Sequence, residues 1–396
     1  MRKILHLDLD AFFCAVEEQR RPELRSRAFA VGGRPNERGV VASCSYAARR
    51  FGVHSAMPMA TALRLCPGLE IVPADHAKYS QASQRVMQLC GNMTPLLEQI
   101  SIDEAFMDVS DLPEPPEQLA RQLQARIDQE THLPCSLGVA ANKLVAKIAN
   151  DVGKAAHRGD GPPRAVTVVP FGGEQAFLAP LPIRMLWGVG KKTEIRMQGI
   201  GVKTIGDLMR INPAVLSQVF GRHGQDFIRQ AQGIDDRPVV VEHEVKSISQ
   251  EVTFDHDLGD LNAIRQTLQS LAAQVGFRLR KGGFSASTIR LKLRWADFTT
   301  LTRQVSVQTP LNQDGLLFDE VVQLLDNVWV PGKKVRLVGV GAGKLTGQTQ
   351  QLSLFDSYGE KELRLLTAVD EIHEKFGNQA IFKGRAMKQK LPGEKE

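Results

Sequence analysis

Three acidic side chains lie in segments that two neighbouring strands could bring together. Asp8 lies in residues 3–10, where leucines occupy alternate positions, so this segment is predicted to be a strand with one buried face. Asp103 and Glu104 lie at the turn of a predicted strand–turn–strand over 97–109. Magnesium prefers hard oxygen ligands, and Mg²⁺ ions that bridge phosphate oxygens promote nucleotidyl transfer. The carboxylates therefore predict a magnesium site, provided that the second strand bends or ends at the acidic pair, because adjacent strand residues face opposite ways. Solvated or capping acids are the alternative.

Aromatic and basic groups nearby could hold the substrate of such a reaction. Tyr46 and Arg49 are three residues apart and so share one helical face, where a phenol and a guanidinium suit the oxygens of β- and γ-phosphates. Phe12 and Phe13 directly follow the Asp8 strand. A ring against C2′ of a sugar leaves no room for a hydroxyl and so selects deoxyribose. The alternative is that both rings belong to the core, and we favour it for Phe12.

The elements that must position these groups alternate between strands and helices as far as about residue 170, which predicts an α+β layer of ferredoxin-like type. Residues 11–74 are expected to be mixed and mostly helical. Residues 171–235 indicate short helices separated by glycines, 235–238 a linker and 246–347 a second α/β unit. The other expected elements are helices over 75–93, 113–131 and 142–152 and strands at 136–140 and 165–169.

Length and composition limit the class of protein. A chain of 396 residues exceeds one ordinary core, and its apolar fraction of 42% is typical of a soluble globular protein. No run of eighteen apolar residues occurs, so no membrane span is expected, and the aspartate at position 8 comes too early for a signal peptide. Five scattered cysteines without a Cys-x-x-Cys pair indicate a reducing cytosol and argue against a zinc site or disulfides. The net charge of +6 permits a polyanionic partner.

Two further segments carry features suited to a DNA backbone. Gly188, Gly190 and Lys191 form a glycine turn before an expected helix, and 199–208 repeats the style. Glycines let backbone amides at a helix N-terminus approach a phosphate closely, so a helix-hairpin-helix pair is predicted, with ordinary helix C-caps as the alternative.

The clearest strand of the sequence is 287–295, where apolar residues alternate with three cations, Arg290, Lys292 and Arg294. Residues 276–306 hold seven Lys or Arg against one acid. A solvated strand face normally mixes charge signs, so this pattern favours a groove for phosphates.

The order and spacing of these motifs resemble those of Y-family DNA polymerases, of the bacterial DNA polymerase IV type, from residue 1 to about residue 347. The resemblance implies that Asp8 and Asp103 bridge two Mg²⁺ ions, that the Leu9 carbonyl is a further ligand and that Glu104 completes the catalytic site beside the primer 3′-hydroxyl. The segments that carry the resemblance are 8–13 and 101–105 for the metal motifs, 45–52 for the fingers motif and 142–154 for a phosphate-binding lysine.

By the same resemblance, Phe13 is the gate that discriminates against ribonucleotides. The small Ala42 and Ser43 match a roof over the nascent base pair, and a loose roof tolerates damaged templates and errors. Lys154 is the triphosphate lysine, but Ala155-Ala156-His157 and an insert at 159–163 replace the family's Pro-Asn-Gly, so Lys147 is the alternative. The nucleotide-binding residues expected are Phe12, Phe13, Ala42, Ser43, Tyr46, Arg49 and Lys154.

The segment Gln351-Leu352-Ser353-Leu354-Phe355 resembles the pentapeptide by which bacterial polymerases bind the sliding clamp. Leu and Phe anchors can fill an apolar pocket while Gln forms hydrogen bonds at its rim. An amphipathic helix over 363–376 follows, for which the sequence indicates no role.

The resemblance implies an α+β multidomain right-hand polymerase with a ferredoxin-like palm, small fingers, a helix-hairpin-helix thumb and an α/β little finger. The activity implied is template-directed, low-fidelity addition of dNTPs to a primer end without proofreading, in translesion DNA synthesis and repair. We expect a cytoplasmic monomer that binds primer-template DNA, dNTP and the sliding clamp. The expected boundaries are 1–10 and 75–170 for the palm, 11–74 for the fingers, 171–240 for the thumb, 246–347 for the little finger and 348–396 for the tail.

Two other functions compete with this hypothesis. A non-catalytic DNA- and clamp-binding scaffold descended from such polymerases predicts loss of a carboxylate, and all three are present. A nucleotidyl cyclase on a palm-like fold would need neither the glycine-turn thumb nor the basic strand. A primer-extension assay distinguishes all three.

Overall fold

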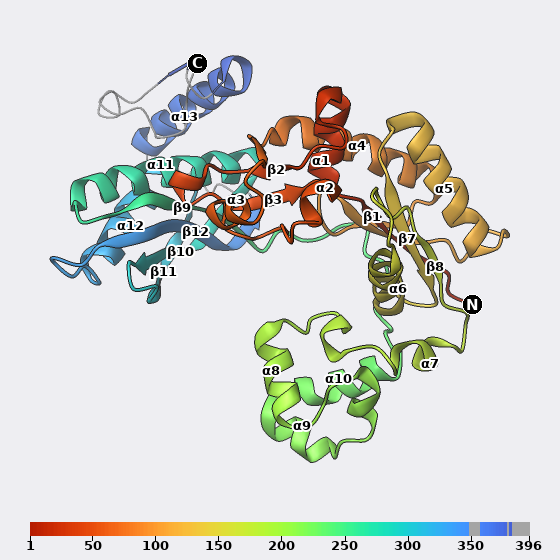
Figure 1. Ribbon diagram of the computed structural model, residues 1–396. Coiled ribbons are helices and arrows are strands. Elements are labelled where there is room, and N and C mark those ends of the chain that lie inside the picture. The colour runs from red at the N-terminus through yellow and green to blue at the C-terminus, as the bar shows by residue number, and fades with distance from the viewer. Residues whose placement is uncertain (348–356, 378–379, 382–396) are drawn as a thin grey trace. The chain divides into compact units, whose positions relative to one another are not determined.

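The computed structural model describes residues 1–347, 357–377 and 380–381 (Figure 1). The chain divides into two compact units, Met1–His243 and the part from Glu244 onward, and each has its own hydrophobic core. Over the described ranges, no helix has the length and apolar character needed to cross a membrane.

The first unit is built on a five-stranded sheet of order β5-β6-β1-β7-β8. Neighbouring strands are antiparallel except β7 and β8, which are parallel. The leucines that alternate along β1 are at most 2% exposed, which confirms the strand predicted at 3–10. The five strands are β1 (Ile4–Leu9), β5 (Leu97–Gln99), β6 (Glu104–Asp108), β7 (Cys135–Ala140) and β8 (Val166–Val168).

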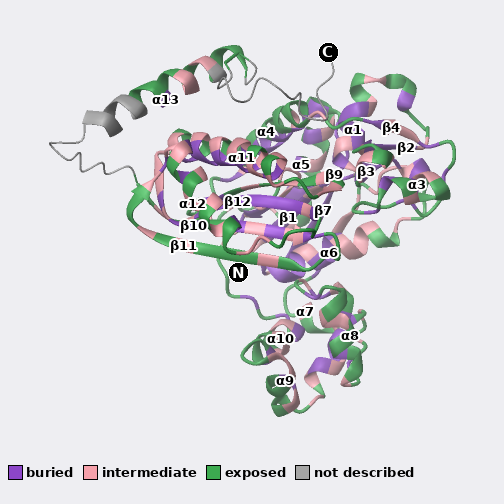
Figure 2. Cartoon of the chain, turned by 90° about the vertical axis from the view of Figure 1, so that its left-hand side faces the viewer, coloured by how far each residue is buried: buried purple, intermediate pink, exposed green. Residues whose placement is uncertain are grey.

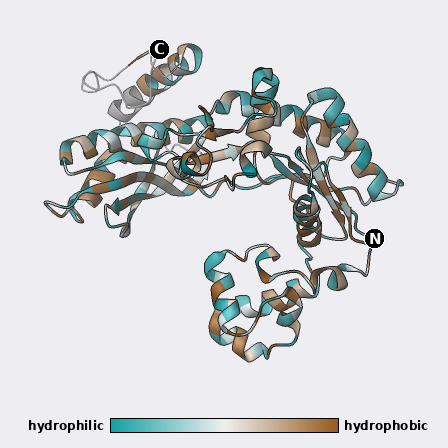
Figure 3. Ribbon diagram, in the orientation of Figure 1, coloured by the Kyte–Doolittle hydropathy of each residue, from teal (hydrophilic) through white to brown (hydrophobic). Residues whose placement is uncertain are grey.

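Helices cover both faces of this sheet (Figure 1). On one face α4 (His76–Met93) and α5 (Pro116–Thr131) share a core with the leucine side of β1. On the other face α6 (Lys143–Ala156) packs in a second core with Ile4. In Figure 3, α5 is mainly hydrophilic (teal) along its length, as expected for a helix on the outside of a sheet. The polar side of β1 therefore faces α6.

Residues 11–74 are mixed and more helical than extended, as expected, but they also contain a three-stranded sheet of order β3-β2-β4 that the sequence did not predict. Each strand has three or four residues, too few to display an alternating pattern, and the parallel β2–β4 pair joins Phe29 to Glu70 from far along the chain. The elements are α1 (Phe12–Arg20), β2 (Phe29–Gly32), β3 (Val41–Cys44), α2 (Tyr46–Arg49), α3 (Met59–Leu65) and β4 (Glu70–Val72), with 3₁₀ turns at Pro22–Leu24 and Pro35–Glu37.

Short helices separated by glycine turns follow, as the sequence predicted for 171–235. Gly188 (φ 94°) and Gly201 (φ 86°) adopt left-handed backbone conformations that favour glycine. The elements are α7 (Glu174–Leu178), α8 (Lys191–Gly199), α9 (Pro213–Phe220) and α10 (His223–Ala231), with 3₁₀ turns at Ile183–Met185 and Ile205–Met209.

The segment 235–238, expected to be a linker, is anchored to the first unit. Asp235 is buried, and its carboxylate accepts a hydrogen bond from the N–H of Leu144, at the start of α6, at 3.0 Å. Arg237 contacts the same carboxylate at 2.7 Å, and its guanidinium lies over the Trp187 ring. Asp235 therefore has a structural role, which the loop-like composition of this segment does not reveal.

The second unit has an antiparallel sheet of order β11-β10-β12-β9, with helices α11 and α12 sharing its core. Figure 2 shows β11 as largely exposed, which fits its place at the sheet edge. The elements are β9 (Ser247–Leu258), α11 (Leu261–Lys281), β10 (Phe284–Trp295), β11 (Thr300–Leu311), α12 (Asp314–Asp326), β12 (Val335–Gly347) and α13 (Ser357–Phe376).

Candidate active site

The pairing of β1 with β6 brings the three predicted carboxylates together. Asp8 lies opposite Glu104 in the antiparallel register, and the N–H of Leu9 donates to the carbonyl of Asp103 at 3.0 Å. Asp103 lies in the turn and Glu104 is the first residue of β6, so both can serve one site. Ser101 fixes this turn, because its hydroxyl accepts from both backbone N–H groups and donates to the Asp103 carboxylate at 2.6 Å.

The carboxylates form a site suited to a hard cation. Burial raises the pKa of Asp103 and of Glu104, and the nearby charge of Asp8 raises both further. A divalent cation would relieve this repulsion, and carboxylate oxygens are the donors that Mg²⁺ prefers, so the residues fit such an ion. Over the described part of the chain, no three His, Cys, Asp or Glu side chains are already gathered as a metal cluster.

Two lysines of α6 contact these carboxylates. Lys154 Nζ donates to Asp8 Oδ1 at 2.6 Å and lies 3.4 Å from Asp10 Oδ1. Lys147 Nζ donates to both carboxylate oxygens of Glu104 at 3.1 Å. Burial opposes the charge of Lys154, but the two aspartates outweigh it and raise its pKa. The sequence offered the two lysines as alternatives, whereas α6 brings both to the site because they lie about two helical turns apart.

Asp10 also belongs to this site and was not among the predicted site residues. It is fully buried, and its carboxylate accepts hydrogen bonds from the Ser136 hydroxyl and from the N–H of Arg164 at 3.0 Å. Burial raises its pKa, and Lys154 opposes that rise. The period-two alternation of the strand could have found it, because His6, Asp8 and Asp10 share one face.

His6 and Asn150 complete the buried polar layer between β1 and α6. The alternation along β1 also places His6 on the face of Asp8, whereas no sequence pattern marks Asn150. Both side chains are inaccessible to solvent. Burial, together with Lys147 and Lys154, lowers the pKa of His6 well below its ordinary value.

The proposed gate residue, Phe13, is half-buried and held from one side. Its ring stacks on the ring of Tyr79, with centroids 4.2 Å apart and planes 14° from parallel. The Tyr79 hydroxyl donates to the buried Glu17 at 2.8 Å, which fixes the supporting ring. Phe12 is 3% exposed and packs in the core, the position favoured for it.

The remaining residues predicted to bind nucleotide lie on β3 and α2. The Tyr46 hydroxyl is buried without a hydrogen-bond partner among the described residues, and the Arg49 guanidinium lies 4.6 Å from the centre of its ring. Burial raises the pKa of Tyr46, so the hydroxyl keeps its proton. Ala42 is exposed on β3 and Ser43 is buried beside it. A buried donor without a partner is one that a substrate oxygen could satisfy.

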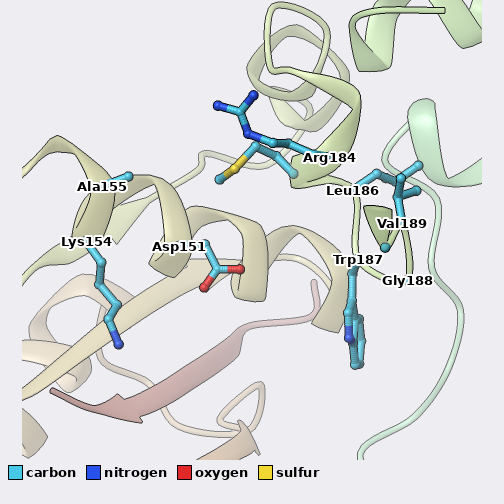
Figure 4. A pocket seen from close by; sticks show the side chains of 10 residues that line it. Asp151, Lys154, Ala155, Arg184, Leu186, Trp187, Gly188 and Val189 are labelled. Atoms are coloured by element: carbon cyan, nitrogen blue, oxygen red, sulfur yellow. The ribbon is translucent and has the colours of Figure 1, made fainter. Parts of the chain in front are cut away.

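A cavity of about 550 Å³ lies between α6 and the segment 184–190. Figure 4 shows Asp151 and Lys154 extending from α6, with Trp187 on the 184–190 side of the cavity. Gly190 is the N-cap of α8 and has no side chain that could cap the first N–H groups of that helix. Backbone amides at this N-terminus are therefore available to a phosphate.

The basic strand is more mixed in charge than its sequence indicated. Arg290 is exposed on β10, and Lys292 and Arg294 are half-buried on the same side. Lys292 pairs with Glu251 of β9 at 2.6 Å across Gly339, which has no side chain to intervene. Only the fold could reveal this acid, because it lies far along the chain from the basic run.

Two cations of the basic run contact α13 instead. Arg280, whose side chain is 7% exposed, bridges Asp314 at 2.8 Å and Asp370 at 2.6 Å. Lys281 pairs with Glu374 at 2.7 Å. Arg280 and Lys281 fasten α13 to α11, so with Lys292 three of the seven positive charges counted along 276–306 pair with acids. The predicted clamp-binding residues Gln351, Leu352, Ser353, Leu354 and Phe355 lie outside the described residues.

Family profiles match three parts of the chain. Residues 7–151 match the impB/mucB/samB family, 184–235 match the thumb domain of DNA polymerase-iota, and 245–354 match the impB/mucB/samB family C-terminal domain.

Curated relatives match almost the whole chain. A DNA polymerase IV of Dehalococcoides mccartyi is 37% identical over 394 residues, which are 98% of this chain and 99% of the relative. A DNA polymerase IV of Desulfatibacillum aliphaticivorans is 40% identical over 96% of this chain and 95% of the relative.

Solved structures show the same fold. A Y-family DNA polymerase chimera of Dbh and Dpo4 superposes with a TM-score of 0.77 at 25% identity, covering 87% of this chain and 99% of its own. An insertion ternary complex of Dbh DNA polymerase gives 0.61 at 25% identity over 86% and 98%.

The fold and the similarities together define the class: the chain belongs to the Y family of DNA polymerases and has their right-hand fold with a thumb domain. It is a low-fidelity, DNA-directed DNA polymerase of translesion synthesis, which binds DNA and nucleotide and uses divalent metal ions. Nothing in these similarities favours the non-catalytic scaffold.

Proposed function

We propose that Asp8, Asp103 and Glu104, with the backbone carbonyl of Leu9, hold two Mg²⁺ ions at the primer end. The observation that supports this most strongly is the β1–β6 register, which sets the three acids around one strand end. When bound, the ions would neutralise charge on phosphate oxygens and lower the pKa of the primer 3′-hydroxyl. The reaction is attack of that hydroxyl on the α-phosphate of a dNTP, with release of pyrophosphate.

Tyr46, Arg49 and Lys154 hold the triphosphate in this proposal. The buried Tyr46 hydroxyl gains an acceptor, and the guanidinium beside it supplies a charged donor. Lys154 Nζ donates to Asp8, so its ammonium group is next to the reacting end. With cations held by the acids, this ammonium group would be available to a phosphate oxygen.

Selection of the sugar and tolerance of the template follow from shape. Phe13, supported from behind by Tyr79, presents its ring to C2′ and excludes a ribose hydroxyl. Ala42 and Ser43 are small, so they leave space above the nascent base pair. Phe12 contributes to this site through packing.

We assign the palm to 1–10 and 75–170, the fingers to 11–74, the thumb to 171–240, the little finger to 246–347 and the tail to 348–396. The division of the chain after His243 and the separate sheets support these boundaries. Gly188, Gly190 and Lys191 of the thumb, and the basic face of β10, bind the DNA backbone without reading sequence. We expect a monomer in the cytoplasm, where its DNA substrate lies.

Primer extension tests the proposal directly. On a primed template with all four dNTPs and Mg²⁺, we expect the primer to lengthen to the template end, and an excess of chelator should stop it. Gel analysis of a labelled primer measures both results. Extension that continues in chelator, or none on any primed template, would contradict the two-metal proposal.

We also propose that the tail peptide 351–355 binds the sliding clamp. A clamp loaded on circular primed DNA should stimulate synthesis by the wild-type protein. Deletion of 351–355 should remove this stimulation, because the Leu and Phe anchors would be lost. Basal synthesis without clamp should stay at the wild-type rate, and comparison of product lengths with and without clamp measures this. A matched variant that replaces only Gln351, Leu354 and Phe355 by Ala should behave the same. Loss of basal synthesis as well would instead indicate a role in folding.

A further inference from the structure

A buried histidine points an unused ring nitrogen at the proposed catalytic glutamate. His6 is completely buried between β1 and α6, and its Nε2 has no hydrogen-bond partner among the described residues. That nitrogen lies 3.9 Å from Glu104 Oε2, about 1 Å beyond an ordinary hydrogen bond. A buried polar atom without a partner calls for an explanation, because such groups are costly to leave unsatisfied.

The neighbouring amide determines which ring nitrogen carries the proton. Asn150 Nδ2 lies 3.1 Å from the carbonyl oxygen of Ser136 and 3.3 Å from that of His6, and only an N–H group can satisfy two carbonyls. The same Nδ2 lies 3.0 Å from His6 Nδ1, and a hydrogen on Nδ1 would collide with the amide hydrogens, so Nδ1 is unprotonated and the ring is neutral. The proton of the neutral ring is therefore on Nε2, and that N–H faces Glu104.

The two partners of Glu104 differ in kind. Lys147 is a charged group on a flexible stem that contacts both carboxylate oxygens and neutralises them. The imidazole is rigid, neutral and fixed from behind by Asn150, and the Phe106 ring packs on it with centroids 4.7 Å apart. A neutral donor can orient a carboxylate without cancelling the charge that a cation requires.

We propose that His6 is a positioning residue for Glu104: its Nε2–H, oriented by Asn150, sets the rotamer in which the carboxylate faces the primer end. Closing the 3.9 Å gap requires Glu104 Oε2 to move about 1 Å toward Nε2. Hydrogen-bonding partners behind a metal-binding carboxylate commonly contribute about tenfold to a hundredfold to activity or metal affinity. This inference rests on the assignment of Glu104 in the proposed function.

A matched pair of substitutions isolates the effect of the His6 Nε2–H donor. His6→Leu keeps a side chain of similar size without the N–H, and it leaves Asn150 with its two carbonyl acceptors, so no buried donor becomes unsatisfied. His6→Gln supplies both an N–H donor and an acceptor. We expect His6→Leu to lower the single-turnover rate of nucleotide addition about tenfold to a hundredfold, with the Kd for dNTP changed less than about twofold. His6→Gln should recover most of the rate.

Metal binding gives a readout that does not depend on turnover. With full-length protein, a dideoxy-terminated primer-template and dNTP, titration of Mn²⁺ followed by electron paramagnetic resonance should show weaker binding for His6→Leu than for His6→Gln. Equal rates and equal Mn²⁺ binding in wild type and His6→Leu would overturn the proposal. An equal loss of rate and of Mn²⁺ binding in His6→Leu and His6→Gln would show that the residue is merely structural. The same conclusion would follow if a lowered melting temperature accompanied the lowered rate.

A double-mutant cycle separates this inference from the function on which it depends. If His6 acts through Glu104, the effect of His6→Leu on rate should disappear in a Glu104→Gln background. An undiminished effect there would overturn the positioning role. Wild-type extension by Glu104→Gln would instead contradict the assignment of Glu104 itself. A slowed but measurable single-turnover rate for Glu104→Gln, together with a wild-type rate for His6→Leu, would leave the proposed function intact and remove only the inference.

Discussion

Replacing Asp103 and Glu104 together by Ala should abolish primer extension. Both carboxylates lie at the end of β6 beside Asp8, and no other described acid takes that position in the β1–β6 pairing. Carboxylate-held ions contribute several kcal/mol to stabilising charge in such a transition state, and about 4 kcal/mol corresponds to about a thousandfold in rate. We therefore expect a fall of at least about a thousandfold in single-turnover rate, measured with a labelled primer.

Two comparisons make this result specific. The isosteric pair Asp103→Asn and Glu104→Gln keeps the volume and should fall almost as far, because charge is what the site requires. Replacing the exposed acids Asp111 and Glu117 by Ala should leave extension unchanged. DNA binding by the inactive variants should persist in a mobility-shift assay. Extension that survives the double alanine replacement would show that the metal site lies elsewhere.

Phe13→Ala should raise the incorporation of ribonucleotides. The ring is half-buried and held against Tyr79, so it cannot move aside for a 2′-hydroxyl without losing that stacking. Overpacking of this kind costs about 1–3 kcal/mol, which is about 5-fold to 150-fold in selectivity. The ratio of kcat/KM for dNTP to kcat/KM for the matching rNTP should fall by that factor, while dNTP incorporation is largely kept.

An exposed phenylalanine outside the site provides the control. Phe171 is 68% exposed, and Phe171→Ala should leave the selectivity ratio unchanged. Phe13→Leu should give an intermediate ratio, because it removes only part of the ring volume. An unchanged ratio in Phe13→Ala would return that residue to the core, as with Phe12.

Short-range patterns in the sequence predicted a large share of the fold. The leucine alternation of β1, the long helices α4 and α5 and the glycine turns near 188 and 201 are local features, and local sterics determine them. The three-residue and four-residue strands of 11–74 have no such periodicity, because their pairing is decided by contacts between distant segments. The same limit explains why 235–238 was interpreted as a linker, although Asp235 caps the start of α6.

For the site, the sequence by itself determined the types of group: three carboxylates, a ring after the first strand, and lysines spaced along one helix. Only the tertiary structure decided how these groups meet. The β1–β6 register set Asp8 against Glu104, α6 brought both Lys147 and Lys154 to the acids, and Asp10, His6 and Asn150 became a buried polar layer. The physical reason is that side-chain chemistry is a local property, whereas burial and charge pairing depend on which distant segments pack together.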